Sequence, residues 1–258
     1  MRILILLLAL FATPVAACGI DSDCEVTGGT YRIYVPDGGA DGAIFFAHGY
    51  GGSAAGTMRN DRLRALAGRL GVALVALASV GKDWALPNAP EHGNGPPRDE
   101  IAYVAAVKAD AVAQFGLDPD RMLLAGFSAG GMLTWNVICQ GGDLFAAFVP
   151  MSGTFWKEPP QSCGTDAAVT HYHGTADTVV PIGGRAIGSS RQGDMGEVLA
   201  FYVRDRALTP AGPVDAPDGL SCQRWDGKEG TYLEYCTHPG GHRFSADWIE
   251  RVWTRDMK

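Results

Sequence analysis

A short stretch near the middle of the chain sets the strongest limit on the fold. The apolar run Met122 to Ala125 leads into the pentapeptide Gly-Phe-Ser-Ala-Gly at 126–130, and a segment typical of a helix follows. Small residues two positions before and after a serine suit a sharp strand-to-helix turn, because a side chain there would strike the neighbouring strand or helix. The pattern therefore predicts a turn that raises the hydroxyl of Ser128 above a sheet, at the positive end of a helix.

A glycine-rich loop is expected upstream of such a turn. The apolar run Ala43 to Ala47 leads directly into His-Gly-Tyr-Gly-Gly at 48–52. Its glycines leave backbone N–H groups uncovered, as a site that holds a negatively charged oxygen requires. We expect the N–H groups of Tyr50 and Ala129 to form this oxyanion hole.

An acid is expected after the turn, at the end of a strand. Asp177 follows the apolar run Val169 to His173 and lies about 50 positions after Ser128, in the order that this arrangement requires. Asp143 and Asp166 are weaker candidates because neither follows a buried strand. The acid is therefore assigned to Asp177.

A histidine should follow the acid. His242 comes after the last predicted strand, and the glycines just before it permit the bend that would return its imidazole to the serine. His238 is the competing residue. His48, His171 and His173 lie in or beside predicted buried strands and are interpreted as structural. His171 and His173 share a strand face without a third ligand, so no metal site is predicted.

These three side chains have complementary chemistry. A serine hydroxyl is a poor nucleophile unless a base takes its proton, and histidine, with a pKa of about 6.5, accepts and returns a proton near neutral pH. Asp177 would fix the tautomer of His242 and stabilise its protonated form. Ser128, Asp177 and His242 are therefore the predicted catalytic residues, and no cofactor is implied.

Length and charge restrict the remaining classes. A chain of 258 residues is long enough for one large α/β domain and too short for two. The net charge is −7 and no cluster of lysine or arginine occurs, so the electrostatic footprint of a nucleic-acid-binding protein is missing. The expected partner is a small or oligomeric neutral molecule, and the sequence does not indicate an oligomeric state.

The first residues resemble an export signal. Arg2 precedes the apolar run 3–11, and Val15 and Ala17 suit signal peptidase. The run is too short to remain as a membrane-spanning helix, and no later apolar stretch is long enough. We predict a signal peptide at 1–17, a catalytic domain at 18–258 and a secreted or periplasmic location.

Six cysteines occur as three close pairs, the pattern of disulfides in an exported chain. Cys18 directly follows the predicted cleavage site, so lipidation of Cys18 as a lipoprotein is an alternative that would leave Cys24 without a partner. Pairing between sequence neighbours is the simplest connectivity. The predicted disulfides are Cys18–Cys24, Cys139–Cys163 and Cys222–Cys236.

Apolar runs typical of buried strands alternate with amphipathic segments along most of the chain. This alternation predicts a mostly parallel central sheet with helices on both faces and a binding site at the carboxyl ends of the strands. Predicted strands lie at 30–35, 43–47, 72–78, 122–125, 145–151, 169–173 and 231–235. Predicted helices run from 54 or 57 to 70, from the Asp99 cap to Gly116, from the serine turn to about 139, and over 195–203 and 248–252, with a loop at 209–219.

An irregular segment at 79–98 is rich in bulky residues, prolines and glycines, and we expect it to fold over the site. Trp84 within it and Phe127 beside the serine are candidate substrate-binding aromatic walls. Trp156 is a further candidate, although a core position is the simpler interpretation.

These motifs together resemble the secreted α/β-hydrolases grouped as polyhydroxybutyrate depolymerase-like and feruloyl esterase-like proteins. The resemblance covers most of the chain and implies an α/β-hydrolase fold and carboxylic-ester hydrolysis by Ser128, Asp177 and His242. Two departures bear on the substrate: Arg243-Phe244 stands where the family often has Trp-Pro, and the sequence does not lead us to expect a separate polymer-binding domain. The matching segments are 48–52, 118–121, 126–132, 144–147, 173–177 and 240–242.

The expected substrates are short-chain or aromatic esters, such as hydroxyalkanoate oligomers or feruloyl esters. An acyltransferase would use the same triad with an alcohol in place of water. A serine peptidase is another alternative, because the segment His-Gly-Thr-Ala-Asp at 173–177 also resembles prolyl-oligopeptidase-type domains. A binding protein on a hydrolase scaffold is disfavoured because all three triad positions are filled.

Overall fold

The computed structural model describes residues 18–90, 97–164, 166–217 and 219–257. The predicted signal peptide lies outside these residues, as do residues 91–96 of the segment expected to cover the site. Among the described residues, no helix combines the length and the apolar character needed to cross a membrane.

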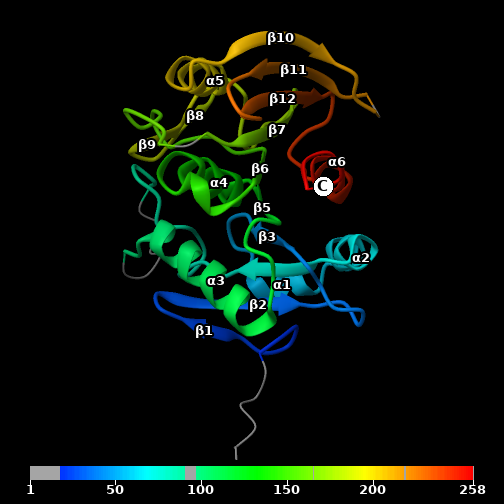
Figure 1. The fold of residues 1–258 in the computed structure, drawn as a ribbon. Helices are drawn as coiled ribbons and strands as arrows, with labels where there is room; N and C mark the ends of the chain where they lie inside the picture. Colours follow the sequence, from blue (N-terminus) through cyan, green and yellow to red (C-terminus); the bar gives the residue numbers. More distant parts are fainter. Residues whose placement is uncertain (1–17, 91–96, 165, 218, 258) are drawn as a thin grey trace, which may run out of the picture.

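A ten-stranded sheet runs through the molecule (Figure 1). Neighbouring strands are parallel from β4 to β12, and antiparallel strands extend the sheet at both sides. The predicted mostly parallel sheet is confirmed. In order across the sheet the strands are β1 (Cys24–Val26), β2 (Gly29–Tyr34), β4 (Ala73–Leu77), β3 (Ala43–Ala47), β5 (Met122–Phe127), β6 (Ala147–Met151), β7 (Ala168–Gly174), β12 (Tyr232–His238), β11 (Ser221–Asp226) and β10 (Thr209–Val214).

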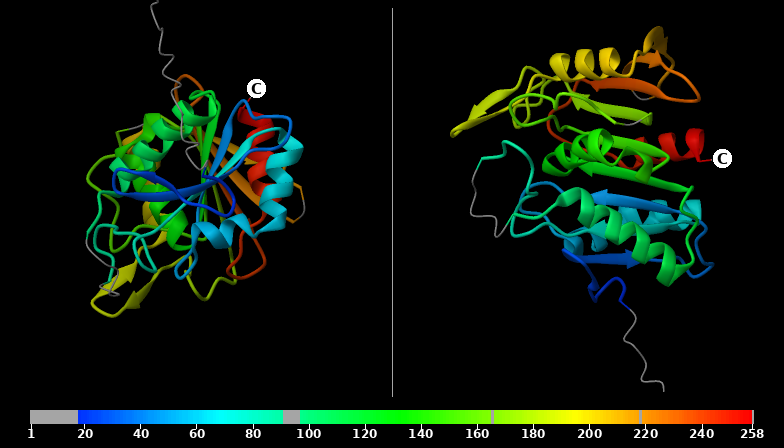
Figure 2. Two further views of the ribbon diagram at one scale, coloured as in Figure 1. Left: turned by 90° about the horizontal axis from the view of Figure 1, so that it is seen from below. Right: turned by 60° about the vertical axis from the view of Figure 1, so that its left-hand side comes forward.

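Helices cover both faces of this sheet, as predicted (Figures 1 and 2). Each face has its own apolar cluster, in which helix side chains pack against the central strands. On one face lie α3 (Glu100–Phe115), α4 (Ala129–Gln140) and α5 (Met195–Asp205), and on the other lie α1 (Ala54–Met58), α2 (Asp61–Leu70) and α6 (Ala246–Asp256). The remaining elements are the 3-10 turn η1 (Gly142–Leu144) and the hairpin of β8 (Arg185–Ile187) and β9 (Ser190–Gln192).

Local sequence signals account for several helix ends. The side chain of Asp99 accepts the N–H groups of Ile101 and Ala102 at the start of α3, and Gly116 ends that helix with φ 66°, both as predicted. The single helix expected up to residue 70 is instead two helices. Asn60 accepts the N–H groups of two following residues and so begins α2 separately.

The main error in the predicted elements lies at the end of the chain. The expected loop at 209–219 contains the edge strand β10, and its partner β11 was not predicted. Pro210 and Pro213 disfavour a strand, and the register shifts between Pro210 and Gly212. Pairing with β11 imposes the extended conformation. The opposite edge of the sheet, β1, is only 3 residues long.

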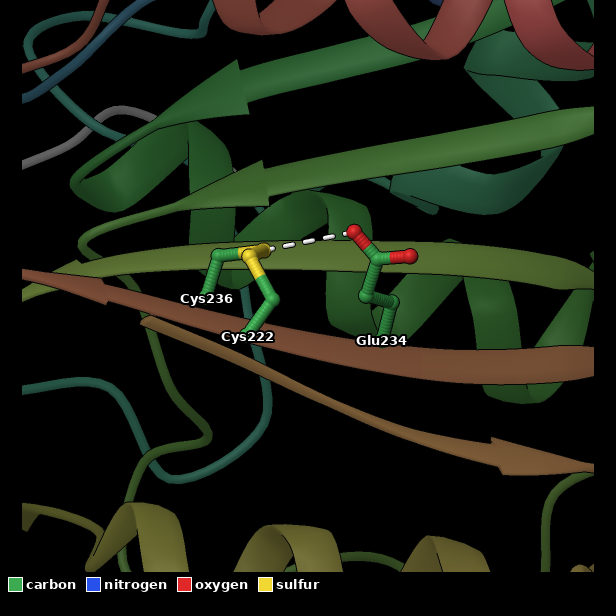
Figure 3. A group of neighbouring side chains, drawn as sticks. All are labelled: Cys222, Glu234 and Cys236. Atoms are coloured by element: carbon green, nitrogen blue, oxygen red, sulfur yellow. Dashed lines mark hydrogen bonds between the residues drawn. A yellow bond between two sulfur atoms is a disulfide. The ribbon is translucent and has the colours of Figure 1, made fainter. Parts of the chain in front are cut away.

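The structure contains the three predicted disulfides. Cys222 and Cys236 lie directly opposite each other on β11 and β12. Glu234 lies beside them, with one carboxylate oxygen 3.3 Å from the sulfur of Cys236 (Figure 3). These three side chains have the spacing of a metal site, but the two sulfurs are joined to each other and are therefore not thiolate ligands.

Glu234 belongs to a buried charged cluster that joins β12 to α6. Its side chain is fully buried and contacts the guanidinium groups of Arg251 and Arg255, the latter at 2.8 Å. Burial lowers the pKa of both arginines, but contacts with neighbouring acidic and phenolic groups outweigh it and raise the pKa of each above its usual value. Both cations therefore remain charged beside Glu234.

Candidate active site

Ser128 lies at the turn between β5 and α4. Its backbone has φ 57° and ψ −119°, a conformation that costs energy in a residue with a side chain. A Cβ atom at Gly126 would lie 2.1 Å from the carbonyl oxygen of Gly130, and one at Gly130 would lie 2.0 Å from that of Ala47. The sharp strand-to-helix turn expected from the sequence is therefore present, and its glycines are required by close packing.

The glycine-rich loop after β3 lies beside this serine. A Cβ atom at Gly49 would lie 3.2 Å from the Cβ of Ser128. The N–H of Gly51 donates to the carbonyl of Lys82 at 2.7 Å, which ties the loop to the segment after β4. The side chain of Tyr50 is 54% exposed. The loop thus brings the backbone of 48–52 to the predicted position of the oxyanion hole.

Trp84 does not lie on the surface of the site, contrary to the expectation that it walls the substrate pocket. It is only 1% exposed, its indole N–H donates to the carbonyl of His48 at 2.9 Å, and its ring packs on the His48 ring. A side chain in this position supports the glycine-rich loop from within. The described part of the 79–98 segment therefore includes a core residue where a binding residue was predicted.

Asp177 lies in the loop after β7. Its Oδ1 accepts the N–H groups of Val179 at 2.9 Å and Val180 at 2.8 Å. Its Oδ2 lies 2.7 Å from Nδ1 of His242. Burial raises the pKa of the Asp177 carboxyl, but the His242 contact and the two N–H donors outweigh burial and leave the pKa below its usual value. Asp177 is therefore ionised at neutral pH.

His242 is positioned by two loops that are tied together. The N–H of Thr175 donates to the carbonyl of His238 at 2.8 Å, and the N–H of Ala176 donates to that of Gly240 at 3.1 Å. The His242 ring also lies against Phe127, the residue before Ser128, with ring centroids 4.6 Å apart. The structure thus brings the predicted acid and the predicted base together beside the serine turn.

His238, the alternative base, is only 2% exposed. Its Nδ1 accepts the N–H of Gly240 at 3.0 Å, which shapes the bend before His242. Burial, together with Arg243 and His173, lowers the pKa of His238. Its contacts are those of a residue that shapes the loop.

The two other aromatic candidates occupy different surroundings. Phe127 is half-buried between His242 and Phe244, with 5.3 Å between the two phenyl rings. Trp156 is mostly buried and forms a bridge with Gln192, and it lines a cavity of about 330 Å³ with Phe155. Phe127 is thus adjacent to the triad, whereas Trp156 belongs to the wall of a separate cavity.

Sequence reasoning missed the backbone donors that hold Asp177. An aspartate that accepts N–H groups two and three residues later forms a recognised turn, and Asp177 has this relation to Val179 and Val180. The local sequence is compatible with this turn, but so are the sequences around many other aspartates in loops. The sequence therefore gave too little signal to assign it.

Comparison with known proteins identifies the fold. A family model described as the prolyl oligopeptidase family matches residues 77–157. An acetyl xylan esterase from Aspergillus awamori superimposes with a TM-score of 0.61 and 15% identity, over 87% of this chain and 93% of that one. The esterase PE8 superimposes with a TM-score of 0.54 and 19% identity, over 90% and 98%. The fold is that of the α/β-hydrolases.

Two curated relatives share sequence with this chain. NocK of Nocardia uniformis subsp. tsuyamanensis, whose name marks it as a proposed esterase, is 27% identical over 194 residues, 69% of this chain. The bifunctional acetylxylan esterase/xylanase XynS20E of Neocallimastix patriciarum is 36% identical over 86 residues, 31% of this chain. The matches span 56% and 12% of these relatives' own lengths.

Proposed function

We propose that this protein hydrolyses carboxylic esters through an acyl-enzyme formed on Ser128. The observation that carries the proposal is the strained serine turn at the start of α4, with a histidine whose ring lies against Phe127 of that turn and contacts a buried carboxylate at 2.7 Å. The relatives whose names include esterase support the same reaction class.

In the proposed mechanism His242 removes the proton of the Ser128 hydroxyl while the serine oxygen attacks the ester carbonyl. Asp177 accepts Nδ1–H of His242, which leaves Nε2 as the acceptor for the serine proton. His242 then gives the proton to the departing alcohol. Water enters, loses a proton to His242 and releases the acid by the same steps in reverse.

The negative oxygen formed at each stage requires hydrogen-bond donors that are already in place. We assign the N–H groups of Tyr50 and Ala129 to this role because their segments flank Ser128 on two sides. The start of α4 adds the partial positive charge of its helix dipole. Loss of one such donor typically costs about 10² to 10³ in kcat.

The proposed substrates are short-chain or aromatic esters, including hydroxyalkanoate oligomers and feruloyl-type esters. Tyr50 and Val179 are exposed large apolar side chains, at 54% and 44%, and they follow β3 and β7 on the two sides of the serine strand. Phe127 adds a third apolar surface next to His242. Together they offer apolar contacts to a small acyl or aryl group.

A serine peptidase is the second candidate because the prolyl oligopeptidase family model matches the region that contains the serine turn. The same triad cleaves amides, so the reaction is decided by the substrate that the surface accepts. Peptide amides with proline before the cleaved bond therefore belong in the same assay as the esters.

We also propose that the protein works outside the cytoplasm, secreted or periplasmic. Three disulfides stabilise the structure, and disulfides persist in oxidising compartments. Cys18 is bonded to Cys24, which favours the disulfide over a lipid at Cys18. Mass spectrometry of the mature N-terminus from the native host would test both points.

Labelling with a fluorophosphonate probe, together with a panel of acetyl, butyryl, feruloyl and palmitoyl esters and a prolyl peptide amide, tests the function. We expect covalent labelling at Ser128, and higher kcat/KM for the short or aromatic esters than for the palmitoyl ester or the amide. Ser128→Ala should lose labelling and turnover while it keeps the fold. Added alcohol acceptors would reveal acyl transfer. Ester turnover that persists in Ser128→Ala within about tenfold of the parent would refute the assignment.

A further inference from the structure

Two buried histidines connect the helix that begins at Ser128 to the loop that carries Asp177. The indole N–H of Trp135 on α4 donates to Nδ1 of His171 at 3.1 Å. Nε2 of His171 lies 2.9 Å from Nδ1 of His173, and Nε2 of His173 lies 2.7 Å from the carbonyl oxygen of Val180. Four residues therefore form one continuous chain of hydrogen bonds.

Only one arrangement of protons satisfies this chain when both histidines are neutral. The indole nitrogen only donates, so Nδ1 of His171 must accept and the His171 proton lies on Nε2. That proton is donated to Nδ1 of His173, so the His173 proton also lies on Nε2. It then points to the carbonyl of Val180, which only accepts. Burial lowers the pKa of both histidines and keeps them neutral.

The end of this chain is tied to the triad acid in two ways. The carbonyl oxygen of Val180 accepts a hydrogen bond from Nε2–H of His173, and the N–H of Val180 donates to Oδ1 of Asp177. Nε2 of His173 also lies 3.7 Å from Oδ2 of Asp177, the oxygen that contacts His242. Val180 is 1% exposed, so water does not readily replace the contact that His173 makes.

We propose that His173 is a positioning residue for the catalytic acid: it holds Val180, and thereby the carboxylate of Asp177, in line with His242, and Trp135 and His171 fix its tautomer. This role for His173 rests on the proposed function of Ser128, Asp177 and His242. The ionisable groups that face Asp177 are His242 from the last loop, His238 at the end of β12 and His173 from β7, with Arg243 acting on His238.

The test compares His173→Phe, which removes the donor, with His173→Gln, whose amide N–H can replace Nε2–H. Tyr172→Phe is the matched control, because Tyr172 is the adjacent buried residue on β7 but stacks on Trp248 on the opposite face. In His173→Phe we expect kcat to fall about 10²-fold, as for a catalytic group displaced by about 1 Å, with KM changed less than about twofold. His173→Gln should recover most of the loss.

The pH profile separates positioning from general destabilisation. Displacement of Asp177 deprives the base of its carboxylate, so the acid limb of kcat/KM should move to lower pH in His173→Phe and stay in place in Tyr172→Phe. An unchanged limb with kcat within about twofold of the parent would overturn the proposal. A shift to higher pH would also overturn it, because it would mean that the protonated base had gained stabilisation rather than lost its carboxylate.

A measurement on the parent protein tests the proposed tautomers without turnover, and it remains available if the His173 variants fail to fold. Nitrogen-15 NMR of the parent should show His173 protonated at Nε2 and bare at Nδ1, and Trp135→Phe should disturb that state. The opposite tautomer in the parent would refute the proposed chain of donors. Fluorophosphonate labelling of the parent distinguishes the two proposals: no labelling means that the triad assignment fails, whereas labelling with an unaffected His173→Phe variant means that only the role of His173 fails.

Discussion

The two faces of the β7–β12 pair bury polar groups in opposite ways. Towards α4, His171 and His173 form a neutral chain that leads from Trp135 to Val180 at the carboxyl end of the strands. Towards α6, Glu234 is surrounded by the permanently charged Arg251 and Arg255. Both arrangements are buried, yet only the neutral one reaches the loop of the proposed triad.

The difference lies in what each carboxylate has as a partner. Glu234 is neutralised by guanidinium groups whose protons do not leave, so its charge serves to hold α6 on the sheet. Asp177 has two backbone N–H donors and an imidazole instead. Its negative charge is therefore available to stabilise the imidazolium when His242 takes a proton.

Asp177→Asn should show the largest effect of this comparison. The amide keeps the shape but removes the charge and favours the wrong tautomer of His242, so kcat should fall by about 10⁴-fold with little loss of stability. Steady-state kinetics and thermal unfolding measure the two quantities. If turnover stayed within about tenfold of the parent, Asp177 would be only a loop-forming residue like many other buried aspartates.

Glu234→Gln should have the reverse effect, a loss of stability with little change in kcat. Removing the charge of Glu234 takes from the half-buried Arg251 and Arg255 the anion that they share, although Arg255 keeps Asp256 as a partner. The free energy of unfolding should therefore fall by about 3 kcal/mol, the lower end of the range for a fully buried pair. The folded fraction should keep kcat within about twofold, because the cluster does not touch the proposed triad. Denaturant titration checks the loss, with Glu25→Gln on the exposed face of β1 as a matched control. A large drop in kcat without loss of stability would contradict the proposed contrast between Glu234 and Asp177.

The smallest effect is the response of stability to mild acid. Burial holds the pKa of His171 and His173 below the value in the unfolded chain, so below about pH 6.5 the unfolded chain takes up protons that the folded one does not. The free energy of unfolding should then fall by roughly 1.4 kcal/mol per pH unit for each histidine kept neutral. The lowered pKa of Asp177 adds a loss only below about pH 4.

Denaturant titrations between about pH 7 and pH 5 measure this slope. His171→Phe should make the slope shallower, because it removes one of the histidines that burial keeps neutral. Arg251 and Arg255 stay charged throughout this range, so these two arginines contribute no slope. Equal slopes in the parent and in His171→Phe would show that the histidine chain is charged or open to water.

The sequence predicted best those elements whose local pattern and final surroundings agree. β3 and β5 are unbroken apolar runs because both of their faces are buried, and both were predicted. β10 was missed because its residues are exposed and include two prolines, and only its pairing with β11 makes it a strand. Strand pairing of this kind depends on both segments together, so the sequence of neither segment alone predicts it.

The site divides in the same way. The order of the motifs along the chain predicted the contact between Asp177 and His242, which is present, while its catalytic role stays a prediction. Trp84 was misplaced because an aromatic residue in an irregular segment suits a pocket wall as well as a core position. His171 and His173 were correctly interpreted as buried, hydrogen-bonded residues. Their link to the acid loop depends on Val180, which no local pattern marks.

The two edges of the sheet bear on how copies of this chain behave when they are crowded. A strand at the rim of a sheet ordinarily offers its unused N–H and C=O groups to any extended chain, and fibrils grow by this route. Pro210 and Pro213 remove N–H donors from β10, and the register shift at Gly212 interrupts its spacing. At the other rim, β1 is too short to template a long partner and is fastened by the Cys18–Cys24 bridge. Fibre growth from either rim of the folded molecule is therefore disfavoured.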